Sequence, residues 1–365
     1  MFAVNHVEGP VRSNKMIIPF LLFVILFCSS SLQACTTFFI NRDNAILLAK
    51  NLDWPLADGI ILVNIKGETK YSFSGDHQSF QWQARYSSIT FNQFGKEFPL
   101  GGINEKGLVV EEMSYSPSRY PPVGEKCVNE FQWIQYQLDN FSTVSQVVEN
   151  IDRISIDPVI AKLHYMICDR QGHVAIIEFI DGEIQCYVDN DVIIPVLTNN
   201  SYSNALNYAK HHQGFGGTRM VSDGPESPER FVRAATLIND IHAVPGEPLH
   251  DDAFDILNAV SQDDTQWSIV YDVASGSIYF RTRQNVFIHQ IELADVDLES
   301  LKMFNLCMND MENQSLRFDD YTVEENLQLI QSVLEKLVTL DELSKDRAGQ
   351  LFESFRNYYK LSMNP

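Results

Sequence analysis

The sequence lacks the features of a disulfide scaffold, a membrane-spanning protein or a nucleic-acid binder. Its 365 residues include six cysteines and no Cys-x-x-Cys pair, which excludes a fold held together by disulfides. No apolar run reaches the roughly 20 residues needed to cross a bilayer. The 27 basic residues are outnumbered by 48 acidic ones, and a negative chain repels phosphate backbones. We therefore expect no integral membrane span and no nucleic-acid partner.

Motifs that bind a metal or a phosphate are also missing. His211 and His212 are adjacent on a predicted helix and point apart, and no His-Glu-x-x-His occurs. The glycine-rich stretch that ends at Gly217 is not followed by Lys-Ser or Lys-Thr, which excludes a P-loop. The sequence therefore predicts neither a metal site nor a cofactor.

The first 34 residues are typical of an export signal. Arg12 and Lys15 precede the apolar run 17–27, which is followed by a small and polar stretch ending at Ala34. Cleavage after Ala34 makes Cys35 the first residue of a secreted or periplasmic protein. The alternative is a lipoprotein, because Leu-Gln-Ala-Cys at 32–35 also resembles a bacterial lipobox, in which the cysteine sulfur is acylated.

Strands and helices are predicted in alternating blocks. With 45% hydrophobic residues, the chain can bury a large core. The first β block is expected to contain strands at 35–40 and 45–51, a pair formed by 60–65 and 70–73, and a hairpin of 99–103 with 108–115. Helical spacing follows over 128–154, with Ser142 as a predicted internal cap.

The second half of the chain repeats this alternation. Strands are predicted at 164–168, 174–179, 183–188 and 192–198, helices at 202–212, 228–242 and 253–260, and strands at 267–272 and 277–282. This order favours an α+β fold of two stacked sheets covered by helices. We predict one domain over residues 35–300 and a helical extension over 301–365 packed on it, because 322–361 has amphipathic helical spacing.

A mature chain that begins with cysteine carries a nucleophile and a base in one residue. The reference pKa of a thiol is about 8.5 and that of an α-amine about 7.7–8, so the free amine of Cys35 can accept the thiol proton. In the alternative interpretations, Cys35 is a small apolar residue that opens a strand, or a lipid anchor.

Ordered segments between Cys35 and Arg283 carry a resemblance to a known family. They are CTTFFI at 35–40, AKNLDW at 49–54, GINEKGL at 102–108, HYMICDRQGH at 164–173, LTNN at 197–200, ERFVRAA at 229–235 and TQWSIVYD at 265–272. They resemble the choloylglycine hydrolase family of N-terminal-nucleophile amidases, which includes conjugated bile acid hydrolases and penicillin V acylases. The resemblance implies a four-layer αββα sandwich in which Cys35 attacks the carbonyl of a linear amide and forms a thioester. Water then hydrolyses the thioester and releases the acid.

The same resemblance implies roles for further residues. Asp53 matches the aspartate that holds the α-amine and thiol in place; otherwise it is a turn or edge carboxylate. Asn199 matches the asparagine whose amide helps form the oxyanion hole, and its alternatives are a strand-end turn or a glycosylation sequon. Arg230 matches an arginine near the nucleophile, and its alternative is a helix-surface arginine, a role that we expect for Arg233.

Two positions depart from the family pattern. Lys50 stands where bile acid hydrolases and penicillin V acylases usually carry arginine, and lysine loses the two-pronged donor geometry. Ser114 stands at the second oxyanion-hole position, where relatives commonly carry asparagine. Trp54 resembles an aromatic residue that lines the acyl pocket of some penicillin V acylases, with core packing as the alternative for both Trp54 and Tyr115.

The functional prediction is therefore an exported cysteine amidase that hydrolyses N-acyl amides of small molecules. The alternatives are an N-acyltransferase, in which an amine resolves the thioester, and a non-catalytic lipoprotein acylated at Cys35. Bile acid conjugates, penicillin V and N-acyl homoserine lactones all remain candidate substrates. Assembly into a homo-oligomer is left open.

Overall fold

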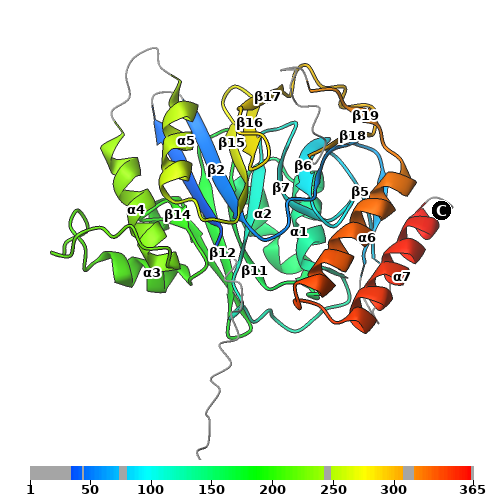
Figure 1. The fold of residues 1–365 in the computed structure, drawn as a ribbon, viewed down its shortest axis with the longest axis horizontal. Coiled ribbons are helices and arrows are strands. Elements are labelled where there is room, and N and C mark those ends of the chain that lie inside the picture. The colour runs from blue at the N-terminus through cyan, green and yellow to red at the C-terminus, as the bar shows by residue number, and fades with distance from the viewer. Residues whose placement is uncertain (1–33, 43–44, 74–79, 242–247, 307–315, 363–365) are drawn as a thin grey trace, which may run out of the picture. The chain divides into compact units, whose positions relative to one another are not determined.

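Two antiparallel sheets form the centre of the protein, and the computed structural model describes them within residues 34–42, 45–73, 80–241, 248–306 and 316–362 (Figure 1). The predicted signal peptide lies outside the described residues except for Ala34. The predicted domain boundaries at residues 34 and 300 therefore stay predictions.

The first sheet carries the strand that Cys35 opens. Its spatial order is β14 (Val196–Leu197), β1 (Thr36–Arg42), β2 (Ala45–Asp53), β15 (Thr265–Asp272), β16 (Ser277–Thr282) and β17 (His289–Glu292). The register pairs Thr36 with Asn51 and Thr265 with Asp53. Because these strands are antiparallel, Cys35, Asp53 and Thr265 come to the same end of the sheet.

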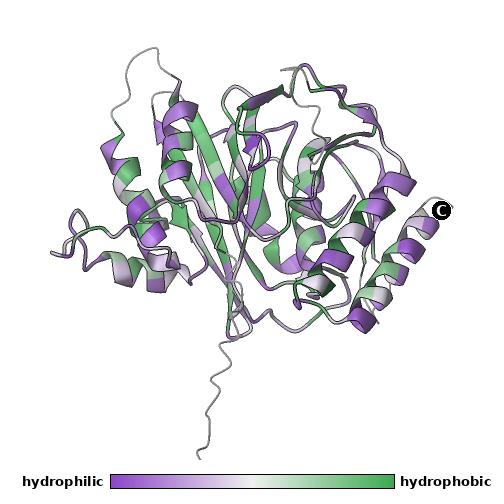
Figure 2. Cartoon of the chain, viewed as in Figure 1, coloured by the Kyte–Doolittle hydropathy of each residue, from purple (hydrophilic) through white to green (hydrophobic). Residues whose placement is uncertain are grey.

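The second sheet faces the first. Its order is β13 (Glu183–Val188), β12 (Val174–Ile180), β11 (Leu163–Cys168), β8 (Val109–Ser114), β7 (Pro99–Asn104), β6 (Ser88–Asn92), β3 (Ile60–Asn64), β18 (Lys302–Asn305) and β19 (Asp319–Asp320). Phe91 of this sheet packs edge-to-face on Tyr271 and Phe280 of the other, with ring centroids 6.3 and 5.7 Å apart. Figure 2 shows hydrophobic residues concentrated along the strands, so the core lies between the sheets.

Helices cover both outer faces. On the first sheet, α4 (Ser227–Asp240) packs on β1 and β14, α5 (Leu249–Ala259) packs on β2 and β15, and α3 (Tyr202–Ala209) packs on α4. On the second sheet, α1 (Glu130–Asn140) packs on β7 and β8 and is followed by α2 (Val144–Glu149). The predicted α+β fold, a four-layer αββα sandwich, is confirmed (Figure 1).

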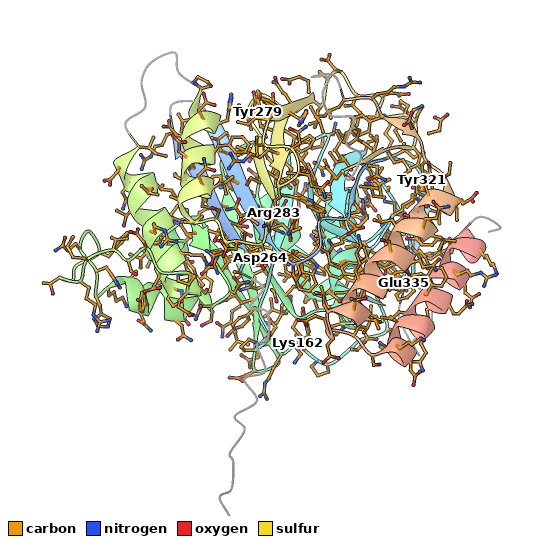
Figure 3. All side chains as sticks on the ribbon, viewed as in Figure 1. Lys162, Asp264, Tyr279, Arg283, Tyr321 and Glu335 are labelled. Atoms are coloured by element: carbon orange, nitrogen blue, oxygen red, sulfur yellow. The ribbon has the colours of Figure 1, made fainter. Side chains whose placement is uncertain are left out.

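The C-terminal helices α6 (Val323–Thr339) and α7 (Lys345–Ser362) pack against each other (Figure 1). The side chain of Thr322 accepts a hydrogen bond from the backbone N–H of Glu325 and caps the start of α6. Glu335, labelled in Figure 3, is exposed on α6, whereas the neighbouring Leu334 is buried. This alternation is what the amphipathic pattern predicts.

One predicted strand pairing and one predicted helix cap were wrong. Segment 70–73 does not pair with β3; β4 (Thr69–Tyr71) pairs with β5 (Gln81–Gln83), and β3 lies between β6 and β18. Every residue of β3 is buried, so this strand needs neighbours on both edges, whereas β4 alternates as an edge hairpin does. Thr143, not Ser142, caps α2, and its side chain accepts from the N–H of Gln146.

Two further short strands, β9 (Cys127–Val128) and β10 (Ser155–Ile156), pair in parallel at the edge of α1. The predicted strand 192–198 is mostly irregular and contributes only β14. Among the described residues, no helix combines the length and the apolar character needed to cross a membrane.

Candidate active site

Cys35 lies immediately before β1, with its side chain in the wall of a cavity of about 160 Å³. Only 3% of the residue is exposed. Burial, with a further contribution from the negative charge of Glu112, raises the pKa of the Cys35 thiol to about 12 in this chain, in which Ala34 precedes Cys35. In this form the thiol is a poor nucleophile, because the thiolate is the reactive species.

Asp53 ends β2 beside Cys35 and is fully buried. Its Oδ1 accepts a 2.5 Å hydrogen bond from the hydroxyl of Thr265. No hydrogen-bond donor among the described residues reaches its buried Oδ2, and Nη1 of Arg230 stays 4.0 Å away. Burial raises the pKa of Asp53 to about 7, although Thr265 and Arg230 both favour its charged form. Buried carboxylate oxygens normally accept a hydrogen bond, so Oδ2 of Asp53 is suited to accept one from an additional N–H or cationic group.

Arg230, in the first turn of α4, connects the start of β1 to the end of β14. Its Nη1 donates to the Cys35 carbonyl at 2.9 Å and to the Thr36 hydroxyl, and its Nη2 donates to Oδ1 of Asn199 at 2.9 Å. Because 1% of the residue is exposed, the guanidinium is held in a fixed orientation. Arg233 is buried as well, and it donates to the carbonyls of Ala259, Ser222 and Gly224. The helix-surface position that we expected for Arg233 is therefore wrong.

Asn199 and Ser114 meet across the two sheets. With its Oδ1 committed to Arg230, Asn199 donates one Nδ2 hydrogen to the backbone carbonyl of Ser114 at 2.9 Å. The second Nδ2 hydrogen has no acceptor in the described part of the chain. Ser114 lines the cavity with Cys35, and Asn199 is not among the lining residues. The structure thus brings Cys35, Arg230, Asn199 and Ser114 into one hydrogen-bonded network.

Lys50 is buried between two acids that the sequence analysis missed. Its Nζ lies 3.0 Å from Oε2 of Glu111 and 2.9 Å from Oε1 of Glu112. Burial opposes the charged ammonium, but the two carboxylates outweigh it and raise the pKa of Lys50. Tyr271 donates to Glu111 at 2.6 Å, and Glu112 lines the cavity with Cys35. The signal that could have revealed these acids is their position within an otherwise apolar strand, since buried acids need a cationic partner.

The two predicted pocket aromatics have different positions. Trp54 lines the cavity, and its indole N–H is buried without a partner among the described residues. Tyr115 is not among the lining residues; it stacks on His164 with ring centroids 5.0 Å apart. Its position therefore gives no contact with the cavity.

The rest of the cavity wall is mainly apolar. It is lined by Leu52, Gln93, Phe94, Leu100, Phe131, Val159, Ile160, Ala161, Leu163, Leu334, Leu337, Glu342, Leu343 and Leu351. The last five come from α6, α7 and the turn between them, which the sequence analysis did not connect with the site. No described His, Cys, Asp and Glu cluster has the arrangement to hold a metal ion.

The chain is similar to known amide hydrolases in sequence. The family of linear amide C–N hydrolases named for choloylglycine hydrolase matches residues 35–309. A penicillin V acylase of Pectobacterium atrosepticum is 27% identical over 257 residues, which cover 64% of this chain and 68% of the relative. A bile salt hydrolase/transferase of Lactiplantibacillus plantarum is 24% identical over 268 residues, which cover 60% of this chain and 81% of the relative.

Solved structures agree with these matches. The penicillin V acylase of Agrobacterium tumefaciens superposes with a TM-score of 0.67 at 25% identity, over 78% of this chain and 98% of that one. A mutant of the conjugated bile acid hydrolase of Clostridium perfringens superposes with a TM-score of 0.61 at 18% identity, over 79% of this chain and 100% of that one, and shares the fold. The chain therefore belongs to the choloylglycine hydrolase family of linear amide C–N hydrolases.

Proposed function

We propose that this chain is exported, that the Ala34–Cys35 bond is cleaved, and that Cys35 then acts as the N-terminal nucleophile of a secreted or periplasmic amidase. Its substrates are N-acyl amides of small molecules, and the reaction passes through a thioester on Cys35. The observation that supports this most strongly is Oδ2 of Asp53, a buried carboxylate oxygen without a donor among the described residues, beside Cys35.

Cleavage changes the chemistry of Cys35 itself. While Ala34 is attached, the Cys35 nitrogen is an amide, which cannot accept a proton, and the pKa of the thiol is about 12. A free α-amine has a pKa of about 7.7–8 and can take the thiol proton near neutral pH. It also supplies the N–H donors that Oδ2 of Asp53 lacks. Processing therefore provides the base and satisfies the buried carboxylate in one step.

The proposed reaction uses the amine twice. The α-amine takes the thiol proton, and the sulfur attacks the carbonyl carbon of the amide to form a tetrahedral oxyanion. The ammonium then gives its proton to the leaving nitrogen, the C–N bond breaks, and an acyl thioester stays on Cys35. The amine next takes a proton from water, whose oxygen attacks the thioester, and the acid and the free thiol are released.

Asn199 is the proposed oxyanion donor. Because the Arg230 guanidinium only donates and fixes Oδ1 of Asn199, the amide must present its NH₂ group toward Ser114 and the Cys35 side of the sheet. One such donor contributes about 10²–10³ in rate. At the second donor position, Ser114 has no side-chain amide, so its contribution must come from a backbone N–H or from the hydroxyl.

Lys50 is a positioning residue in this scheme. The ammonium of Lys50 forms ion pairs with Glu111 and Glu112, so Lys50 fixes Glu112 in the cavity wall near the thiol. Lysine and serine at positions 50 and 114 replace the arginine and asparagine of orthodox bile acid hydrolases. We therefore expect weak or absent activity on conjugated bile acids.

Intact-mass and N-terminal analysis of the exported protein tests the proposal. The expected product begins at Cys35 with a free amine and thiol, and it hydrolyses at least one member of a panel of penicillin V, N-acyl homoserine lactones and glycine or taurine bile acid conjugates. A diacylglyceryl adduct on Cys35 would instead support the non-catalytic lipoprotein and end the amidase proposal.

A second candidate is N-acyl transfer, in which an amine replaces water. The relative from Lactiplantibacillus plantarum is named as both hydrolase and transferase, which keeps this reaction open. Adding a primary amine at increasing concentration separates the two. A transferase forms a new amide in proportion to the amine, whereas a strict hydrolase yields only the free acid.

A further inference from the structure

The C-terminal helices lie outside the part of the chain that the family match covers, yet they form one wall of the Cys35 cavity. The match ends at residue 309, and α6 begins at Val323. Leu334 and Leu337 of α6, Leu343 of the turn and Leu351 of α7 all line the cavity that Cys35 lines. Three of these leucines are buried, at 3%, 5% and 4% exposure for Leu334, Leu337 and Leu351.

Specific contacts hold this wall in place. Nζ of Lys336 on α6 lies 2.6 and 2.7 Å from the two carboxylate oxygens of Asp58, in the loop that follows Asp53. On α7, the ring of Phe355 stacks on Phe73 at 4.8 Å, and Tyr358 donates to the Tyr71 carbonyl at 2.9 Å. These contacts tie α6 to the loop between β2 and β3 and tie α7 to the end of β4 and the residues after it, so both helices are fixed on the rest of the protein.

The cavity has a defined size and a mainly apolar lining. Phe94, Leu100, Phe131 and Leu163 line it together with the leucines, and none of its lining residues is basic. Its volume of about 160 Å³ is close to the roughly 150 Å³ of an apolar protein cavity that accommodates benzene. An anionic group would gain no partner there, and a fused four-ring steroid would exceed the space.

We infer that α6 and α7 form the distal wall of the acyl subsite and set the upper limit on the acyl group that this enzyme accepts. The acyl group is neutral and apolar, about the size of one aromatic ring or an alkyl chain of about six to eight carbons. This inference rests on the proposed function for the position of the scissile bond at Cys35.

The binding of product acids tests the inference without turnover. The test uses mature protein carrying Cys35→Ala and measures by calorimetry the dissociation constants of straight-chain carboxylic acids from four to twelve carbons. Affinity is expected to rise about fourfold per methylene and to stop rising at about six to eight carbons. Leu337→Ala should move this limit about two to three carbons longer, with about 15- to 60-fold tighter binding of the ten-carbon acid.

Two further variants control for folding. Ile330 is fully buried on the same helix but is not a lining residue, so Ile330→Ala removes as much side chain and should leave the limit unchanged. Leu343 is only partly buried, and Leu343→Trp should shorten the limit by about two carbons even if Leu337→Ala does not fold. An unchanged limit in Leu343→Trp, or affinity that still rises beyond ten carbons in the parent protein, would overturn the inference.

Failure of the proposed function gives a different result. The same substitutions in protein that keeps Cys35 are assayed for kcat/KM on N-acyl amides of equal chain lengths. A shifted binding limit without any amide cleavage supports the wall and refutes the amidase proposal. Amide cleavage whose chain-length limit ignores both Leu337→Ala and Leu343→Trp refutes the wall and leaves the amidase proposal standing.

Discussion

The two ends of the Cys35 cavity are built in different ways. At the reactive end, Arg230, Asn199, Asp53 and Lys50 are held by hydrogen bonds and ion pairs of defined length, within the part of the chain that the family matches. At the distal end, leucines of α6 and α7 provide only shape. Chemistry requires polar atoms in fixed positions, whereas an acyl wall requires volume, so substitutions should be far more damaging at the reactive end.

The largest expected effect is at Cys35, the proposed nucleophile. Replacing the thiol by a hydroxyl in Cys35→Ser should lower kcat about 10⁴-fold or more, because a hydroxyl is far less acidic and less nucleophilic than a thiol in a site arranged around sulfur. Steady-state assays on the mature protein measure this, with thermal unfolding as the folding control. Full activity in Cys35→Ser would refute the assignment of the nucleophile.

The next effect concerns the buried lysine. Lys50→Met leaves Glu111 and Glu112 buried without their cation, which should cost about 3–5 kcal/mol of the free energy of unfolding. The matched control is Lys66→Met, because both side chains of the Lys66–Glu299 ion pair are exposed and its loss should leave the free energy of unfolding nearly unchanged. Urea denaturation measures both. Equal losses in the two variants would contradict the buried network.

A smaller loss is expected at Asn199, the proposed oxyanion donor. Asn199→Ala should lower kcat about 10²–10³-fold, because it removes an N–H from the transition state and an acceptor from Arg230. Asn199→Asp keeps the acceptor and loses the donor, so it should be as inactive as Asn199→Ala. An Asn199→Asp enzyme near full activity would show that Asn199 acts only by holding Arg230.

The pH dependence of stability tests Asp53. In protein that retains Ala34, the pKa of Asp53 is about 7, above its ordinary 3.8, so the folded state binds this proton more tightly. The contribution of this proton to the free energy of unfolding is full below about pH 4. It is lost as the pH rises through 7, by up to about 1.4 kcal/mol per pH unit. Asp53→Asn should remove this slope, and so should cleavage before Cys35, because the new ammonium lowers the pKa of Asp53. Identical slopes of stability against pH in all three proteins would argue against an interaction between Asp53 and the α-ammonium of Cys35.

The smallest effect is expected at the distal wall. Leu334→Met conserves volume and apolar character, so activity on short N-acyl amides should change by less than about twofold and stability by less than about 1.5 kcal/mol. Parallel kinetic and denaturation measurements check this. A loss as large as that of Asn199→Ala would mean that the wall contributes more than shape.

The same contrast explains what could be predicted from the sequence. Cys35, Asp53, Asn199 and Arg230 stand in ordered motifs, and antiparallel pairing of β14, β1 and β2 is enough to bring three of them together. Glu111 and Glu112 were missed because nothing local shows that Lys50 lies across from them on the facing sheet. The leucines of α6 carry only an amphipathic pattern, which predicts that one face is buried but not against what.

The most direct test of the whole account is rapid-quench mass spectrometry of the mature enzyme during turnover of penicillin V or another cleaved N-acyl amide. The expected N-terminal peptide begins at Cys35 and transiently gains the mass of the acyl group as a thioester that hydroxylamine removes. An acyl group on any other residue, or turnover by protein that still carries Ala34, would contradict it.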